Sequence, residues 1–126
     1  MKRLSEEEQQ RYLHDQLELP WTIVDRKLTL CLSLASLQEV HEFLTRLARE
    51  ANEQHHHPDL EVNARVVEVS LTTHDASGLT ILDFDFARAV EKHYKHIESM
   101  RLSKLLFQEV LQVFVSSIEH QYVSFF

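Results

Sequence analysis

The chain has 126 residues, with 13 basic and 20 acidic side chains, nine His, one Cys, two Pro and a single Gly. Glycine usually makes up about 7% of a protein, and glycine-rich phosphate loops, dinucleotide-binding turns and collagen repeats each need several glycines, so all three are excluded. The formal charge of −7 disfavours direct binding to nucleic acid, because that affinity comes from clustered Lys and Arg.

The composition, 44% hydrophobic and 26% charged, predicts one folded domain over residues 1–126. No run of about 18 uncharged apolar residues is present, so no membrane partner is expected. A single Cys cannot form an internal disulfide, and no apolar signal segment follows Met1, which together predict a cytoplasmic protein. We expect Cys31 to be a small apolar packing residue.

The first part of the chain predicts a helix and a hairpin. Ser5 and Glu8 form a Ser-x-x-Glu capping box, which predicts a polar surface helix over about residues 5–18. Two short β-rich runs follow, at 21–24 and 28–32, and the three polar residues between them predict a β-hairpin.

The middle of the chain predicts a helix and a strand. Ser36 and Glu39 form a second capping box before apolar residues at helical spacing, so we expect a helix over about 36–53. From 61 to 73 apolar residues alternate with polar ones, with one phase shift after Val66. We interpret this segment as one long strand with a bulge or twist.

The last part of the chain predicts two further helices. Thr80 and Asp83 cap one that runs to about residue 97, and Ser103 caps another that runs to about residue 119. The order of elements predicts an α+β fold: a two-layer domain with a small antiparallel sheet covered on one face by helices, plus an extra C-terminal helix. Exposed sheet edges favour a homo-oligomer, a dimer or tetramer.

A histidine-rich loop is the candidate chemical site. His55, His56 and His57 precede Pro58, and His74 ends the strand that follows. Imidazoles both donate and accept protons near neutral pH, so they could form an acid/base set. A metal site is an alternative, although adjacent His residues rarely face one ion. On composition alone, a solvated polar loop is the favoured alternative.

Linked motifs run from this loop to the next helix. His-His-Pro at 56–58 is followed by Leu-Thr-Thr-His, ending at His74, and by Gly-Leu-Thr-x-x-Asp over 78–83. Over about residues 4–97 the chain resembles the pterin-4a-carbinolamine dehydratase family. Residues 98–126 have no counterpart in the resemblance and are expected to form a C-terminal helical extension.

The resemblance implies a hydro-lyase that uses no metal or organic cofactor. Its substrate class is 4a-hydroxytetrahydropterin, which loses the C4a hydroxyl and the N5 proton to give quinonoid dihydropterin. Catalytic roles are implied for His56 and His74 as the proton-transfer pair and for His57 as a substrate-binding or assisting group. Pro58 and Asp83 are expected to bind the substrate, Asp83 also as an orienting carboxylate.

The chain also departs from the family pattern. Asn52 stands at a commonly acidic position, and Leu60 and Ala64 at positions that are usually aromatic. The alternative is therefore a catalytically weakened family member that acts as a pterin-binding or protein-interaction module with a protein partner. Gly78 and Pro58 bracket the expected pocket, and we expect both to mark sharp backbone turns.

Overall fold

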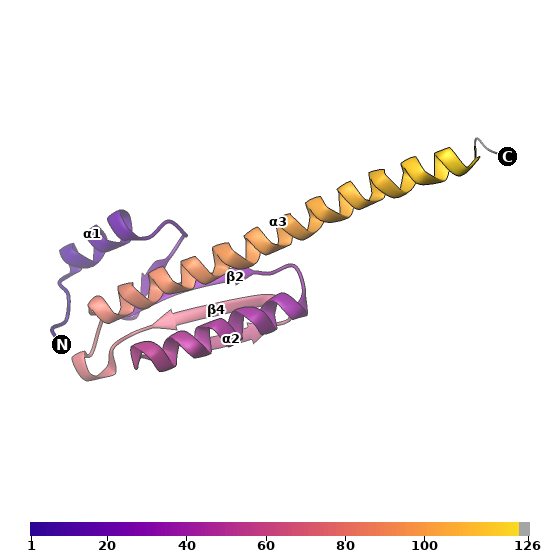
Figure 1. Ribbon diagram of the computed structural model, residues 1–126. Coiled ribbons are helices and arrows are strands. Elements are labelled where there is room, and N and C mark those ends of the chain that lie inside the picture. The colour runs from indigo at the N-terminus through magenta and orange to yellow at the C-terminus, as the bar shows by residue number, and fades with distance from the viewer. Residues whose placement is uncertain (124–126) are drawn as a thin grey trace. The chain divides into compact units, whose positions relative to one another are not determined.

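The computed structural model describes residues 1–123. Residues Met1–Tyr94 form one compact unit, and a second begins at Lys95. Figure 1 shows the order of the elements along the chain. They are α1 (Glu6–Gln16), β1 (Thr22–Val24), β2 (Lys27–Ser33), α2 (Leu37–Gln54), β3 (Asp59–Asn63), β4 (Val66–Leu71), the 3₁₀ turn η1 (His74–Ala76) and α3 (Ile81–Val123).

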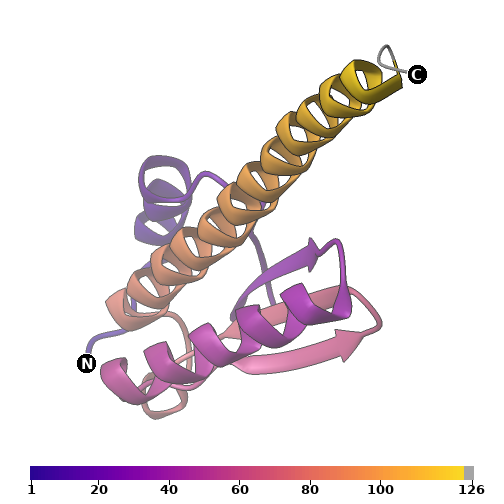
Figure 2. The same ribbon diagram turned by 45° about the vertical axis from the view of Figure 1, so that its right-hand side comes forward.

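The sheet confirms the expected α+β fold. Its four strands are all antiparallel and lie in the order β1-β2-β4-β3. In the first unit α2 and the beginning of α3 cover one face of the sheet (Figure 2). The inward-facing apolar side chains of β2 and β4 are buried together with Phe43, Phe86 and Val90 of the helices. This packing removes apolar surface from water and provides the main stabilisation of the layer.

The capping predictions are confirmed at the first two helices. The Ser5 side chain accepts a hydrogen bond from the backbone of Glu8, whose carboxylate accepts one from the backbone of Ser5. Ser36 caps α2 by accepting a hydrogen bond from the backbone N–H of Glu39. Both contacts satisfy backbone donors that the first turn of a helix leaves free.

The prediction of one long strand over 61–73 is wrong, because two strands form a hairpin there. Val62 and Val67 are cross-strand partners, and Asn63 pairs with Val66. Ala64 turns the chain with φ 53°. A two-residue turn changes which residues face the core, and this reversal produces the phase shift that we interpreted as a bulge.

The prediction of a helix break between residues 97 and 103 is also wrong. The extra C-terminal helix is present, but as the continuation of α3. No Gly or Pro lies between residues 79 and 126, so nothing there interrupts the helical hydrogen bonds. Within residues 1–123 no helix is both long and apolar enough to cross a membrane.

Cys31 is exposed, which contradicts the prediction of a packing residue. It lies between the buried Leu30 and Leu32 of β2. Because successive strand residues face opposite sides, Cys31 lies on the uncovered face of the sheet. The alternating pattern determines its position more strongly than its apolar character does.

A buried carboxylate fixes the segment between α1 and β1. Glu91 of α3 accepts hydrogen bonds from the backbone N–H groups of Glu18 and Leu19 and from Nε1 of Trp21. Trp21 and Glu91 are both buried. Three donors on one carboxylate compensate the cost of its burial and attach this segment to α3.

Candidate functional site

The site begins at the N-terminus of α3, where Asp83 is completely buried. Its Oδ2 atom accepts a hydrogen bond from the backbone N–H of Thr80 at 3.0 Å. The Thr80 hydroxyl in turn accepts one from the N–H of Leu82. The predicted cap of Thr80 and Asp83 is therefore confirmed, and the carboxylate lies at the positive end of the helix dipole.

His56 meets this carboxylate from the end of α2. His55 ends that helix in the left-handed conformation, and the chain then turns so that the His56 ring is nearly buried. His56 Nε2 lies 2.6 Å from Asp83 Oδ1. The ring also meets Phe86 edge-on, with centroids 6.3 Å apart. A carboxyl group and an aromatic neighbour together hold the imidazole in one orientation.

Thr73 completes the cluster, and our sequence analysis did not identify it. Its hydroxyl donates to Asp83 Oδ2 at 2.8 Å and lies 2.8 Å from the Thr80 hydroxyl. The signal was its position two residues after the buried Leu71, which places Thr73 on the inner side of the strand's continuation. A polar residue at an inward position needs a buried partner, and Asp83 is that partner.

The arrangement leaves one ring nitrogen of His56 for chemistry. A carboxylate only accepts hydrogen bonds, so Nε2 carries the proton when it contacts ionised Asp83. Nδ1 is then the atom that can accept or relay a proton. An ionised Asp83 thus favours one tautomer of His56.

The structure does not bring the other predicted residues into this hydrogen-bonded cluster. His74 follows Thr73 directly and begins η1, but its side chain is exposed. His57 is also exposed, and Pro58 is half-buried. Exposed imidazoles beside a buried, oriented one are accessible to a small molecule from solvent.

Gly78 has a different role from the one we expected. Its φ lies outside the left-handed region, and Ser77 holds that conformation instead with φ 54°. A Cβ atom on Gly78 would lie 2.6 Å from Cδ of Arg3. The backbone N–H of Leu4 donates to the carbonyl of Leu79 at 2.8 Å. The missing side chain at Gly78 leaves room for the Arg3 side chain, where the N-terminal segment packs against the loop that follows His74.

A second histidine–carboxylate contact joins α2 to α3. His93 Nε2 lies 3.0 Å from Glu50 Oε1, and both side chains are largely buried. The hydrogen bond from Gln54 lowers the pKa of the Glu50 carboxyl by more than burial raises it, and the contact with His93 acts in the same direction as Gln54. This contact fixes the last turns of α2, which precede the histidine loop.

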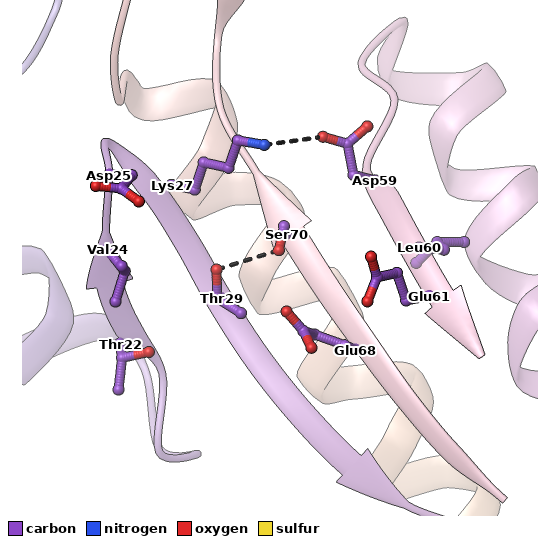
Figure 3. Close-up of a pocket in the computed structure, with 10 residues that line it drawn as sticks. All are labelled: Thr22, Val24, Asp25, Lys27, Thr29, Asp59, Leu60, Glu61, Glu68 and Ser70. Carbon is purple, nitrogen blue, oxygen red and sulfur yellow. Dashed lines mark hydrogen bonds and ion pairs between the residues drawn. The ribbon is translucent and has the colours of Figure 1, made fainter. Parts of the chain in front are cut away.

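The uncovered face of the sheet carries a separate hollow of about 670 Å³. Figure 3 shows its acidic side chains, Asp25, Asp59, Glu61 and Glu68, with Lys27 as the basic residue among those drawn. None of the predicted catalytic histidines lines it. Across residues 1–123, no three His, Cys, Asp or Glu side chains come together as a metal site would require.

The fold and the His56–Asp83 cluster define an α+β domain with an oriented, buried imidazole. The chain belongs to the pterin 4 alpha carbinolamine dehydratase family, whose model matches residues 2–93. A relative from Christiangramia forsetii, named for this family, is 39% identical over 93 residues, covering 72% of this chain and 92% of its own. One from Nostoc punctiforme is 36% identical over 72 residues, 57% of this chain and 77% of its own.

Solved structures agree with the fold. One from Brucella melitensis, described as a transcriptional coactivator/pterin dehydratase, matches with a TM-score of 0.67 and 28% identity over 73% of this chain and 98% of its own. Another is described as a pterin dehydratase-like RuBisCO assembly factor of the alpha-carboxysome. It matches with a TM-score of 0.51 and 19% identity, over 61% of this chain and 89% of its own.

Proposed function

We propose that this protein is a cytoplasmic hydro-lyase that dehydrates 4a-hydroxytetrahydropterin to quinonoid dihydropterin by metal-free histidine acid/base catalysis. The observation that carries the proposal is the 2.6 Å contact between His56 Nε2 and the buried Asp83, within the segment that the family model matches. A fixed imidazole beside a carboxylate is suited to general acid/base catalysis.

The reaction needs two proton transfers and no redox step. The C4a–O bond breaks, and the leaving hydroxide takes a proton from one imidazolium to become water. The N5–H proton passes to the other imidazole as the C4a–N5 double bond forms. We assign these transfers to His56 and His74, and substrate contact to His57 and Pro58. Complete burial of Asp83 supports an orienting role for it.

A turnover assay tests the proposal directly. The purified protein should shorten the lifetime of enzymatically generated 4a-hydroxytetrahydropterin. His56→Gln and His74→Gln should each lower kcat by roughly 10²-fold or more, the usual contribution of a general acid or base. The matched control is His55→Asn, which changes the neighbouring exposed imidazole and keeps a residue that tolerates the left-handed conformation.

Two results would count against it. If the wild-type protein leaves the lifetime of 4a-hydroxytetrahydropterin unchanged, it is not a dehydratase for this substrate. Equal losses in the His55, His56 and His74 variants, with unchanged far-UV circular dichroism, would mean that the chosen pair is wrong.

The second candidate is a pterin-binding or protein-interaction module. Asn52, Leu60 and Ala64 support it, because Asn52 stands at a commonly acidic position of the family and the other two stand at usually aromatic positions. Leu60 is partly exposed, and Ala64 lies in the turn after β3. Relatives of this fold include proteins described as a coactivator and as an assembly factor. Calorimetric titration with a dihydropterin separates the two candidates, because binding without turnover selects the module.

A further inference from the structure

The two buried threonines beside Asp83 form hydrogen bonds that run in one direction. The Thr80 hydroxyl oxygen accepts a hydrogen bond from the backbone N–H of Leu82 at 3.2 Å, so its own proton is available to the Thr73 hydroxyl, 2.8 Å away. Thr73 then donates its hydroxyl proton to Asp83 Oδ2, also at 2.8 Å. Both threonines are buried, where a hydroxyl proton without an acceptor is costly. The hydrogen bonds therefore run from Thr80 through Thr73 to Asp83.

The opposite direction would leave a buried proton without an acceptor. If Asp83 Oδ2 carried a proton and donated it to Thr73, Thr73 would have to donate to Thr80 instead. The Thr80 oxygen would then accept from both Thr73 and Leu82, and its own proton would have no acceptor among these four residues. Because an unsatisfied buried donor is unfavourable, Oδ2 acts only as an acceptor. The backbone N–H of Thr80 is its second donor, at 3.0 Å.

Only the other carboxylate oxygen is left to compete for a proton. Asp83 Oδ1 lies 2.6 Å from His56 Nε2, and a proton between these atoms belongs either to the carboxyl or to the imidazole. The two donors on Oδ2 stabilise the charged carboxylate. The positive end of the α3 dipole acts in the same direction. Both effects favour the proton on His56 Nε2.

We propose that Thr73 is a positioning residue, whose hydroxyl keeps Asp83 in the carboxylate form and thereby holds the His56 proton on Nε2, leaving Nδ1 to exchange protons with the substrate. The inference rests on the proposed dehydratase for the catalytic role of His56. Backbone hydrogen bonds in both directions between Thr73 and Gly78 fix the position from which the hydroxyl donates. His74 is the next residue, so Thr73 is connected to both histidines that we assign to proton transfer.

Nitrogen-15 and carbon-13 NMR of the full-length protein tests the proposal without a substrate. The pH should run from about 6 to 9, the range in which an ordinary histidine loses its proton. In the wild type we expect a carboxylate signal for Asp83 Cγ and a protonated signal for His56 Nε2 throughout, so that only Nδ1 changes. Thr73→Val keeps the shape of the side chain but removes the donor. The Asp83 signal should then move toward the carboxylic acid range at low pH, and Nε2 toward the unprotonated range.

Two further variants are the controls for Thr73→Val. Thr73→Ser keeps the hydroxyl and should restore both wild-type signals. Thr72 is the neighbouring threonine, and its hydroxyl donates to the carbonyl of Arg26 at 3.0 Å. Thr72→Val therefore makes the same chemical change outside the cluster and should leave both signals unchanged.

Kinetics provide a second measurement on the same variants. Thr73→Val should lower kcat about tenfold, the effect of losing a hydrogen bond to a charged group, and should leave KM nearly unchanged. Thr73→Ser should recover most of the lost kcat. A threonine with a structural role alone would change the stability of the protein without changing the position of the His56 proton.

Several results would overturn the proposal. One is a wild-type Asp83 signal in the carboxylic acid range or an unprotonated His56 Nε2, and neither observation requires a variant to fold. Another is a Thr73→Val protein with the same signals as the wild type. An inactive wild type with the expected NMR signals would refute the dehydratase alone, whereas an active one with the opposite signals would refute the role of Thr73 alone.

Discussion

Asp83 combines two functions in one side chain, since it caps α3 and orients His56. Asp83→Asn keeps the shape of the side chain. It places an amide opposite the hydrogen-bond donors that contact the carboxylate in the wild-type protein. We expect a loss of about 1–3 kcal/mol in the free energy of unfolding. An amide N–H facing His56 should also move the ring proton from Nε2 to Nδ1.

Urea unfolding and nitrogen-15 NMR of the histidine rings measure both effects. Asp85→Asn is the control on the same helix, because Asp85 makes only a partly exposed pair with Arg88 and should change stability by less than about 0.5 kcal/mol. An unchanged His56 tautomer in Asp83→Asn would contradict the orienting role.

Gly78 and Arg3 affect each other because their atoms lie close together, and Gly78 does not adopt a left-handed backbone conformation. Gly78→Ala in an Arg3→Ala background should stabilise the protein by about 0.4–1 kcal/mol, because alanine restricts the unfolded chain. With Arg3 present the gain should disappear, because the arginine stem must move. A double-mutant cycle by urea unfolding measures this coupling, and additive effects would exclude it.

At the level of elements, the uncovered face of the sheet contains a repulsive pair. Glu61 of β3 and Glu68 of β4 are direct cross-strand partners, and like charges directly opposite destabilise a sheet. Glu61→Gln should therefore raise the unfolding free energy by about 0.2–1 kcal/mol. The gain should vanish in a Glu68→Gln background. Equal gains in both backgrounds would show that the pair does not interact.

The contact between α2 and α3 should contribute to acid sensitivity. The pKa of Glu50 is lowered in the folded protein by Gln54 and His93, so the unfolded chain binds the proton more readily. The stabilisation that ionised Glu50 contributes is complete above the pKa of this residue in the unfolded chain, about 4.5. It is lost as pH falls through the lower pKa of Glu50 in the folded protein. Glu50→Gln should thus flatten the loss of stability below about pH 4.5, measured by urea unfolding. Parallel curves for variant and wild type would refute it.

Local signals predicted the elements well where one residue type dictates the geometry. The capping residues Ser5, Ser36 and Thr80 mark three helix starts that the structure confirms. The β3–β4 turn escaped prediction because its left-handed residue is Ala64, where Gly or Asn is usual. Of the candidate site, the linked motifs identified His56 and Asp83, but long-range contacts such as Thr73 with Asp83 or Glu91 with Trp21 depend on the fold.

On the scale of the whole molecule, the two units should differ in how strongly their amide protons are protected from hydrogen exchange. The side chains of residues 102–118 are exposed, whereas β2 and β4 carry buried core residues, and local opening is easier where few apolar side chains are buried. The amide protons of residues 102–118 should therefore exchange faster than those of β2 and β4. Mass spectrometry of peptides measures this, and equal behaviour in both regions would contradict it.

Within residues 1–123, five residues other than glycine occupy the left-handed region: Asp25, Arg26, His55, Ala64 and Ser77. Such a conformation costs a residue with a side chain roughly 1–2 kcal/mol, less for Asp. Four of the five lie in the β1–β2 turn, the β3–β4 turn and the loop after η1. In these short connections the chain must reverse its direction because the segments on either side pair with each other. Adaptation of this protein to higher temperature could therefore begin in its turns, where one substitution relieves strain, and leave the packed core unchanged.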